Sequence, residues 1–443
     1  MVIRSFHAFT KVTAPAFAAM TLASLLTTAP AHAALPSSTD FGPAIDNVSY
    51  EGQSTCSPQA KPGMLAFRRI VMDRYPNTGL GGISRACNIG GQSEHKEGRA
   101  WDWGVNASYA SHRAMVKDLI GWLLAEDGYG NSAAMAKRFG IMYLIWNKRI
   151  WGSWSGWSTY CVQKRRGCVD PDDGDLRNPH TDHVHFSMSR DGAQKKTTFW
   201  NKDRSMLATV APHPSYGYWE LGRNGGVASY GTGWHGSKSD VYLDTPAAAM
   251  VSTVSGYGYW IVTKRGRVFP FGDARNRGQL IDKQITVVDI EPTPSGGGYW
   301  LLARSGRVFA YGDASNIGGA KEAGDTLAGM AATPTGLGYW LFGTNGNVYA
   351  YGDASDLGGL ANDGLETPVI GGDNFGATGY WLATAGGRVA AFGDAPELGA
   401  PEAVNSPVVS FAASPSRAGY WVMSERGRLW TFGDAQELGT LGN

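Results

Sequence analysis

Three histidines lie close together in the segment RNPHTDHVHFSM, which runs from Arg177 to Met188. They are His180, His183 and His185. Imidazole binds metal ions and exchanges protons near neutral pH, so such a cluster indicates chemistry. On a strand, residues two apart face the same side, so we expect His183 and His185 to share one face and Asp182 and Val184 to face away. One strand supplies too few ligands for a metal site, so others must come from elsewhere.

The missing ligands are expected upstream, in SEHKEGRAWDWGV, where six residues separate His95 from Asp102. A neutral imidazole and a carboxylate are suitable zinc ligands, and a catalytic zinc keeps three protein ligands and one position for water. His95, Asp102 and one histidine of the strand would complete that set. Two or three nitrogens with one carboxylate favour zinc over magnesium or calcium.

Together the two segments resemble the zinc D,D-peptidases, a family that includes D-alanyl-D-alanine carboxypeptidases, VanX-type dipeptidases and the Hedgehog amino-terminal domain. The first segment fits the pattern Ser-x-His-x-x-Gly-x-Ala-x-Asp through Ser93, His95, Gly98, Ala100 and Asp102. The commonest form of the family has a glutamate three residues before the last histidine ligand, where this chain has Asp182. The second segment instead resembles the His-x-x-His-x-His of the murein endopeptidase branch. The resemblance covers roughly residues 80–190, and the six-residue spacing argues against the lysostaphin-like class.

The resemblance implies roles for these residues. His95, Asp102 and His185 would be the zinc ligands, His183 would be the catalytic base beside the bound water, and His180 would assist it. Asp182 is the alternative base. Zinc lowers the pKa of bound water to roughly 7 and polarises a carbonyl, and His183 would pass the proton to the leaving amine. The implied substrates are peptidoglycan stem peptides, cleaved next to D-alanine; the sequence leaves open carboxypeptidase or endopeptidase, and a D,D or an L,D bond.

Other residues near the motifs are candidates for binding substrate. Arg85 and Arg99 have the bidentate geometry that holds a carboxylate, although structural roles are common for arginine, and Ser93 is the third candidate. Glu97, beside Lys96, is expected to be solvated. The tryptophans of this region are expected to pack rather than to bind glycan; they are Trp101, Trp103, Trp146, Trp151, Trp154 and Trp157.

These residues must be positioned by a first domain, predicted over residues 41–204 as an α+β fold of the zinc-peptidase type. Helical periodicity covers residues 63–77 and 112–128, and a third helix is expected over 131–140, closed by Gly140. Residues 140–154 indicate two strands around Asn147 and Lys148, and residues 182–188 indicate another. Strands that follow helices favour a small sheet with helices on one side.

A second domain is predicted over residues 206–443, because the sequence repeats there. GYW ends at Trp219, Trp260, Trp300, Trp340, Trp381 and Trp421, at spacings of 41, 40, 40, 41 and 40 residues. Gly-Asp-Ala follows in five of the six units, at Asp273, Asp313, Asp353, Asp394 and Asp434. Six such units predict an all-β domain, a six-bladed β-propeller with one blade per unit, with a β-solenoid as the alternative. The aromatic residues are expected to form the blade cores, and the aspartates to fix turns between blades.

These units also resemble the Tyr-Trp and Gly-Asp-Ala repeats found beside cell-wall hydrolase domains in exported actinobacterial proteins. The resemblance implies that the repeats bind a surface, through a cell-wall polymer or a surface glycan, without naming the ligand.

The start of the chain predicts export. Arg4 and Lys11 precede the apolar run APAFAAMTLASLL, and small residues at Ala31 and Ala33 complete a signal peptide over residues 1–33. An uncleaved signal anchor is the alternative. No later stretch approaches the roughly 20 apolar residues of a membrane span, so we expect a secreted protein, extracellular or associated with the cell wall.

The cysteines fit an oxidising compartment. There are four, an even number, and three pairings are formally possible. We predict Cys56 with Cys87 and Cys161 with Cys168, because the latter two flank the short loop VQKRRG. Zinc ligation by cysteine is the alternative, disfavoured because no CxxC pair is present.

Length and charge set the remaining limits. A chain of 443 residues favours two domains. Lys plus Arg number 39 against 38 for Asp plus Glu, which gives no reason to expect nucleic acid or an anionic membrane as partner. The leading function is a zinc peptidoglycan peptidase targeted by its repeats. The alternatives are a non-catalytic cell-surface binding protein with a zinc-stabilised domain, and a zinc amidase of peptidoglycan.

Overall fold

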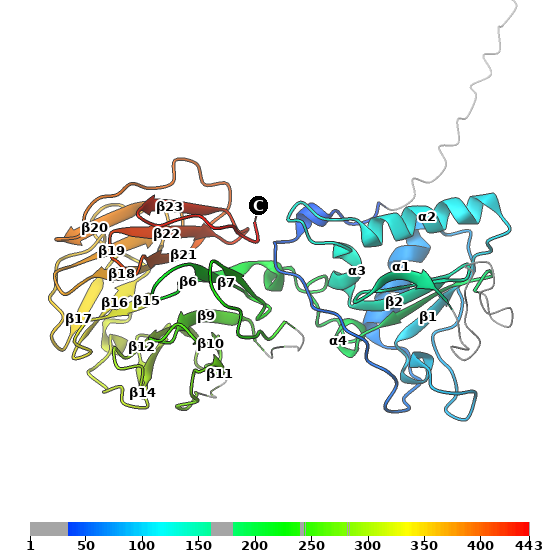
Figure 1. Cartoon of the computed structure of the whole chain (residues 1–443), viewed down its shortest axis with the longest axis horizontal. Coiled ribbons are helices and arrows are strands. Elements are labelled where there is room, and N and C mark those ends of the chain that lie inside the picture. Colours follow the sequence, from blue (N-terminus) through cyan, green and yellow to red (C-terminus); the bar gives the residue numbers. More distant parts are fainter. Residues whose placement is uncertain are drawn as a thin grey trace, which may run out of the picture.

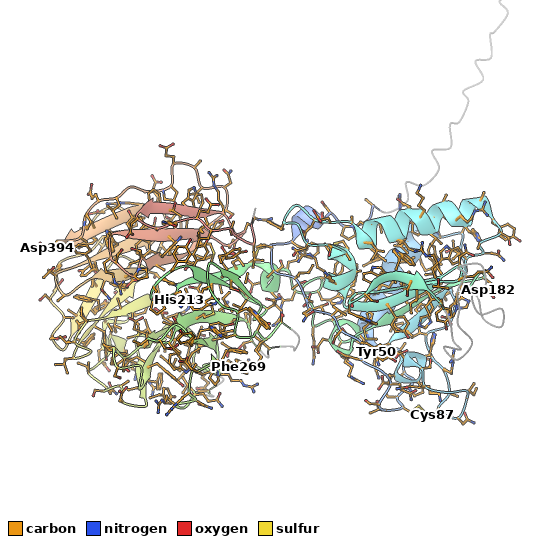
Figure 2. All side chains as sticks on the ribbon, viewed as in Figure 1. Tyr50, Cys87, Asp182, His213, Phe269 and Asp394 are labelled. Atoms are coloured by element: carbon orange, nitrogen blue, oxygen red, sulfur yellow. A yellow bond between two sulfur atoms is a disulfide. The ribbon has the colours of Figure 1, made fainter. Side chains whose placement is uncertain are left out.

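The computed structural model describes residues 34–160, 180–239, 243, 245–280, 282 and 284–442. The chain forms two parts, one of helices and strands and one of repeated small sheets (Figure 1). Tyr50 and Asp182 lie in the first part, and His213 and Asp394 lie in the second (Figure 2). The 3-10 helix η5 (Lys202–Ser205) ends the first part, and the first repeat strand starts at Leu207. The predicted signal peptide lies outside the described residues.

The first part contains one five-stranded antiparallel sheet, in the order β1-β5-β2-β3-β4. Its strands are β1 (Ala100–Trp103), β2 (Ile141–Trp146), β3 (Arg149–Gly152), β4 (Gly156–Thr159) and β5 (Val184–Met188). The two predicted strands around Asn147 and Lys148 are β2 and β3, and both turn residues have positive φ, at 45° and 67°. Positive φ at both central residues is typical of the tight turns whose twist matches that of a hairpin. Strand β5, late in the sequence, lies between β1 and β2 and is buried throughout.

Helices pack on this sheet, and side chains from both form the hydrophobic core of the first part. They are α1 (Pro62–Arg74), α2 (Ala110–Leu124), α3 (Ala134–Phe139) and α4 (Arg190–Ala193), with the 3-10 helices η1 (Ser38–Asp40) and η2 (Glu94–Glu97). Proline at the first position of α1 has the φ that a helix requires and lacks only an N–H that would have no partner there. Phe67 of α1 packs edge-on against Trp101 of β1 and Phe186 of β5. This contact fixes the two strands that carry the site.

The tryptophans divide into two groups. Trp101 and Trp103 are fully buried and Trp151 is buried, as expected for packing residues. The same expectation is wrong for Trp154 and Trp157, which are 51% and 37% exposed. Trp157 lies on β4, the edge strand of the sheet, where no neighbouring strand covers it.

The second part consists of six three-stranded antiparallel sheets. The first three sheets contain β6 (Leu207–Pro212), β7 (Tyr218–Gly222) and β8 (Val227–Tyr230); β9 (Ala247–Ser252), β10 (Gly258–Thr263) and β11 (Val268–Gly272); and β12 (Val287–Pro292), β13 (Tyr299–Ala303) and β14 (Val308–Tyr311). The 3-10 helix η6 (Lys321–Ala323) follows. The other three contain β15 (Leu327–Ala332), β16 (Tyr339–Gly343) and β17 (Val348–Tyr351); β18 (Val369–Phe375), β19 (Gly379–Thr384) and β20 (Val389–Gly393); and β21 (Val408–Ala413), β22 (Gly419–Ser424) and β23 (Leu429–Gly433).

The repeated aromatic residues form the contacts between these sheets. The tyrosine of each middle strand packs against the tryptophan of the preceding unit, with ring centroids 5.2–5.8 Å apart. Tyr218 of the first unit makes the same contact with Trp421 of the last unit, at 5.4 Å. The first strands contact one another in series, and β21 also contacts β6. The GYW of each unit therefore contributes its tyrosine to the interface with the preceding unit and its tryptophan to the interface with the next unit.

The repeated aspartates fix turns within one sheet, not between sheets as predicted. Asp313, which follows β14, accepts hydrogen bonds from Thr293 and Ser295, which follow β12. The end of the third strand is thereby tied to the turn that joins the first and middle strands. The arrangement recurs at Asp273, Asp353 and Asp434. At Asp394 it is absent among the described contacts, because the fifth unit has Asn374 and Gly376 in place of the hydroxyl residues.

One predicted disulfide is confirmed. Cys56 and Cys87 are bonded, and their Cα atoms lie 5.9 Å apart. The other predicted pair, Cys161 with Cys168, lies outside the described residues. No helix in the described ranges is long and apolar enough to span a membrane.

Candidate metal centre

The centre of the site is a cross-strand pair. Strands β1 and β5 are antiparallel, and their register places Asp102 opposite His185. Side chains that face each other across such strands have Cβ atoms about 4.5–5.5 Å apart, so their polar ends can meet. Here Asp102 Oδ1 lies 2.9 Å from His185 Nδ1.

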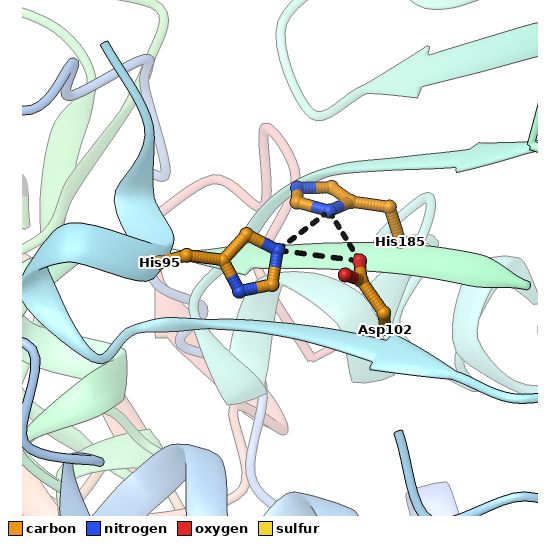
Figure 3. Close-up of side chains that lie close together, drawn as sticks. All are labelled: His95, Asp102 and His185. Atoms are coloured by element: carbon orange, nitrogen blue, oxygen red, sulfur yellow. Dashed lines mark hydrogen bonds and ion pairs between the residues drawn. The ribbon is translucent and has the colours of Figure 1, made fainter. Parts of the chain in front are cut away.

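The third member, His95, reaches the pair from η2. Gly98 ends this helix with φ 66°, and a Cβ at Gly98 would lie 2.0 Å from the carbonyl oxygen of Gln59. Only glycine fits there, which explains the Gly of the motif. The turn leads directly into β1 and brings His95 Nε2 to 3.2 Å from Asp102 Oδ1 and 3.3 Å from His185 Nδ1 (Figure 3).

These three side chains can hold a metal ion, since their ligand atoms all lie within 4.8 Å of one another. Bonds of about 2.0–2.1 Å to a tetrahedral ion place ligand atoms about 3.3 Å apart, close to the observed separations. His95 Nδ1 lies 2.8 Å from the carbonyl oxygen of Ile83, which can only accept. In a neutral ring the hydrogen is then on Nδ1, which leaves the lone pair of Nε2, on the side of Asp102, for a metal ion.

The electrostatics favour the forms that bind metal. Burial would raise the pKa of Asp102, but hydrogen bonds to His185 and His95, with the positive charge these rings can carry, hold that pKa well below its usual range. Burial lowers the pKa of His185, and Asp102 opposes this shift only in part. An ionised carboxylate and a neutral imidazole are the ligand forms that a metal ion needs.

The structure brings His183 and His180 to the same place. His183 Nε2 lies 3.6 Å from Asp102 Oδ1, and its Nδ1 lies 2.8 Å from Asp182 Oδ1. His180 is buried, with its ring centroid 4.6 Å from that of His183 and 5.9 Å from that of His185. Asp182 is 76% exposed and contacts the outer nitrogen of His183.

Sequence reasoning missed a second group of residues around His185. The ring of Tyr143, on β2, stacks on that of His185 at 5.6 Å. Tyr143 donates a hydrogen bond to Glu94 at 2.6 Å, and Ser187 Oγ lies 2.9 Å from His185 Nε2. Burial and Glu94 raise the pKa of Tyr143, so the hydroxyl keeps its proton. Ser187 could have been found from the sequence, because it lies two residues after His185 on the same strand face; Tyr143 carries no such signal.

The candidate substrate residues fall in different places. Arg99 is 1% exposed and donates to Glu97 and to the carbonyl oxygens of Met188 and Glu51, so its guanidinium already has structural partners. Ser93 is buried before η2, and its N–H donates to Gln53. Arg85 is half-buried, and its N–H donates to the carbonyl oxygen of His95. Of the three candidates, Arg85 is therefore the one that is not buried.

The expectation that Glu97 is solvated is wrong. Glu97 is buried and accepts hydrogen bonds from Arg99 and from the backbone N–H groups of Ser54 and Thr55. Burial would raise its pKa, but these donors lower the pKa to about 2. Lys96 is buried as well, with its ammonium on the carbonyl oxygen of Gly90. These partners, Ser54, Thr55 and Gly90, flank the Cys56–Cys87 disulfide in the sequence.

Comparisons with known proteins give one partial match. A family model described as "VldE, C-terminal domain" matches residues 56–169, about a quarter of the chain, a range that contains His95 and Asp102 but not β5. This family is a different one from the zinc D,D-peptidases that the motifs resemble. No curated protein matches. Among solved structures, a chain of "Crystal Structure of Mitotic Checkpoint Complex" is similar over 52% of this chain and 74% of its own, at 13% identity and a TM-score of 0.38, too low to carry any argument.

Proposed function

We propose that this chain is an exported zinc-dependent peptidase that cleaves peptidoglycan stem peptides next to D-alanine. One observation carries the proposal: His95, Asp102 and His185 converge on one point, and His183 lies beside them. Two imidazoles with one carboxylate are a common ligand set of catalytic zinc. When bound, zinc lowers the pKa of a water molecule and polarises the scissile carbonyl.

His183 is the proposed catalytic base. Its Nδ1 contacts Asp182, which orients the ring and leaves Nε2 to accept the proton of the attacking water. The same nitrogen then delivers the proton to the leaving amine. Asp182 fits the orienting role better than the role of base, because its carboxylate is largely exposed and held on the far side of His183. His180 packs against His183 and keeps its ring in place.

We propose further that the six sheets are the blades of a closed β-propeller. The contact of β21 with β6, and of Trp421 with Tyr218, supports closure, because each repeats between the last and first units the contact that joins neighbouring units. Closure gives the first and last sheets the neighbours that every other sheet has, and a propeller leaves only short, protected sheet edges. In this proposal the repeats hold the peptidase at the cell wall. The Cys56–Cys87 disulfide supports an oxidising, extracellular location.

The test is mass spectrometry of purified muropeptides after incubation with the zinc-loaded protein. We expect loss of terminal D-alanine or splitting of cross-linked dimers with wild type, and neither product with His185→Ala or after chelation. His183→Ala should keep zinc and lose about 10²–10⁴-fold in turnover. His112→Gln, outside the cluster, is the matched control and should match wild type.

Two results would replace the proposal. Unchanged peptides from a protein with one equivalent of bound zinc would favour a non-catalytic binding protein. Release of the whole stem peptide from the glycan strand would favour an amidase.

A further inference from the structure

A cavity of about 300 Å³ opens where the first strands of the six sheets begin. All six sheets contribute to it. The second residue of each first strand lines its wall; these are Ala208, Ala248, Val288, Ala328, Ile370 and Val409. This wall is therefore apolar. The polar residues of the cavity lie at other positions of the repeat unit.

Three cations surround this apolar wall. Arg223, Lys264 and Arg304 line the cavity, and each lies four residues after the GYW tryptophan of its unit. They come from three successive units. The hydroxyl residues Thr286 and Thr344 also line the cavity, and no carboxylate does among the described residues. The whole chain has 39 basic and 38 acidic residues, so its charges nearly cancel, whereas the charged residues that line this cavity are all basic.

Two of these cations lack a counterion. Arg223 pairs with Asp203 and, at 3.7 Å, with Glu425. For Lys264 and Arg304, the described part of the chain offers no carboxylate within 4.0 Å. Burial lowers the pKa of Lys264; Asp203 opposes this shift, and the like charges of Arg223 and Arg304 add to it. Lys264 is half-buried and Arg304 is exposed. Neighbouring cations that repel one another are stabilised by an anion between them.

We propose that this cavity binds a phosphate group of a phosphodiester-linked polyol polymer of the cell wall; the location at the wall rests on the function proposed above. The planar guanidinium of Arg304 matches two phosphate oxygens, and Lys264 adds a compact charge. The threonine hydroxyls are further donors. The volume accommodates the phosphate and part of the adjoining polyol, at the small end of the range for ligand sites.

The experiment is isothermal titration calorimetry of the full chain with inorganic phosphate, glycerol 3-phosphate, a short oligo(glycerol phosphate), acetate and glycerol. We expect all three phosphate ligands to bind, the oligomer most tightly, and acetate and glycerol not to bind. The variant Lys264→Gln/Arg304→Gln should bind the oligomer at least about tenfold more weakly. Arg265→Gln/Arg307→Gln removes the same charge from neighbouring residues outside the cavity and should bind within about twofold of wild type. Thermal unfolding confirms that both variants are folded.

Each of the other possible results overturns a particular part of this proposal. Equal weakening in the two variants would show diffuse attraction to a basic surface, which overturns the site. Equal binding of acetate would overturn the preference for phosphate, and binding of free phosphate but not of the oligomer would overturn the polymer. No binding by wild type would overturn the proposal as a whole. His185→Ala should still bind the oligomer, so the peptidase proposal and this one fail separately.

Discussion

The two parts of the molecule use buried polar groups in opposite ways. In the first part, residues far apart in the sequence meet once, and two buried carboxylates are paired with arginines. Glu97 lies on Arg99, and Asp127 lies 2.8 Å from Arg138, with both of those side chains fully buried. In the repeats, one aromatic contact recurs six times, and buried carboxylates accept backbone N–H groups without a cation.

The pKa values follow from this difference. Burial raises the pKa of Asp289 to about 7, although the N–H groups of Met330 and Ile290 oppose the shift. Burial likewise raises the pKa of Glu220 to about 7 against the N–H of Leu441. Glu97, which is surrounded by the backbone N–H groups of Ser54 and Thr55 and by Arg99, has its pKa lowered instead, so the set of donors around each carboxylate decides the direction. The comparison teaches that the site-bearing part depends on specific charges, whereas the repeats depend on shape and on repetition.

The largest expected effect is on the paired charges of the first part. Arg99→Leu leaves Glu97 with Arg190, at 3.7 Å, as its nearest cation, and removing one partner of a buried ion pair costs about 3–5 kcal/mol in the free energy of unfolding. Hydrogen exchange of the β1 and β5 amides during urea unfolding measures this loss. Arg69→Leu, at an exposed helical position, is the control and should stay within about 0.5 kcal/mol of wild type. A small effect of Arg99→Leu would mean that pairing is not what holds the first part together.

The sequence predicted the site better than its surroundings. The motifs grouped Asp102 with His95 and His185, and strand alternation placed His183 and His185 on one side, because both signals are local in the sequence; the strand β1 that carries Asp102 was not predicted. Neither could place Glu97 in the interior, since its burial depends on Ser54 and Thr55, more than 40 residues earlier. Tyr143 was missed for the same reason: β5 lies between β1 and β2, and this order depends on contacts distant in the sequence.

In the repeats, the sequence predicted the units and their aromatic cores because a 40-residue period is visible without any structure. It did not predict which turns the aspartates tie, because that requires knowing which strand ends meet. The exposed Trp154 and Trp157 show the same limit: composition favours packing, and only the position at the sheet edge decides otherwise.

The second prediction concerns pH, where Asp289 of the repeats and Glu97 of the first part should act with opposite sign. In the folded chain Asp289 keeps its proton up to about pH 7, whereas its unfolded value is 3.8. Between about pH 4 and 7 the folded state therefore binds more protons, and stability of the repeats falls as pH rises, by roughly 2–4 kcal/mol for this group. Glu97, lowered from 4.5 to about 2, instead stabilises the first part above pH 4.5, and this stability is lost as pH falls toward 2.

Urea unfolding between pH 2 and 7, followed by hydrogen exchange in each part, measures how the stability of each part changes with pH. Asp289→Asn should flatten the slope of the repeats, and Asp356→Asn, at an exposed turn, should leave it unchanged. An unchanged slope in Asp289→Asn between pH 4 and 7, or first-part stability that does not fall between pH 4.5 and 2, would contradict the comparison.

The third prediction tests the residues around His185. Ser187→Ala removes the partner of His185 Nε2, and Tyr143→Phe removes the link to Glu94 while keeping the stacked ring. Each should weaken zinc binding by roughly 10–100-fold, as is typical for partners of metal ligands, with little change in stability. Competition with a chelator of known affinity measures this. Tyr109→Phe, at an exposed position, is the control; wild-type zinc affinity in both test variants would mean that the ligands are held by the strands alone.

The smallest expected effect is in a single repeat. Asp313→Ala removes the acceptor of Thr293 and Ser295, and about 1 kcal/mol of stability should be lost, because the freed hydroxyls can turn to water. Asp394→Ala removes the same residue type from the fifth unit, where Asn374 and Gly376 replace the hydroxyl donors, and should change stability by less than about 0.5 kcal/mol. Thermal unfolding of the two variants side by side measures the difference. If both lose the same stability, the aspartate acts through its backbone position rather than through the two hydroxyls, and the units are more alike than their sequences indicate.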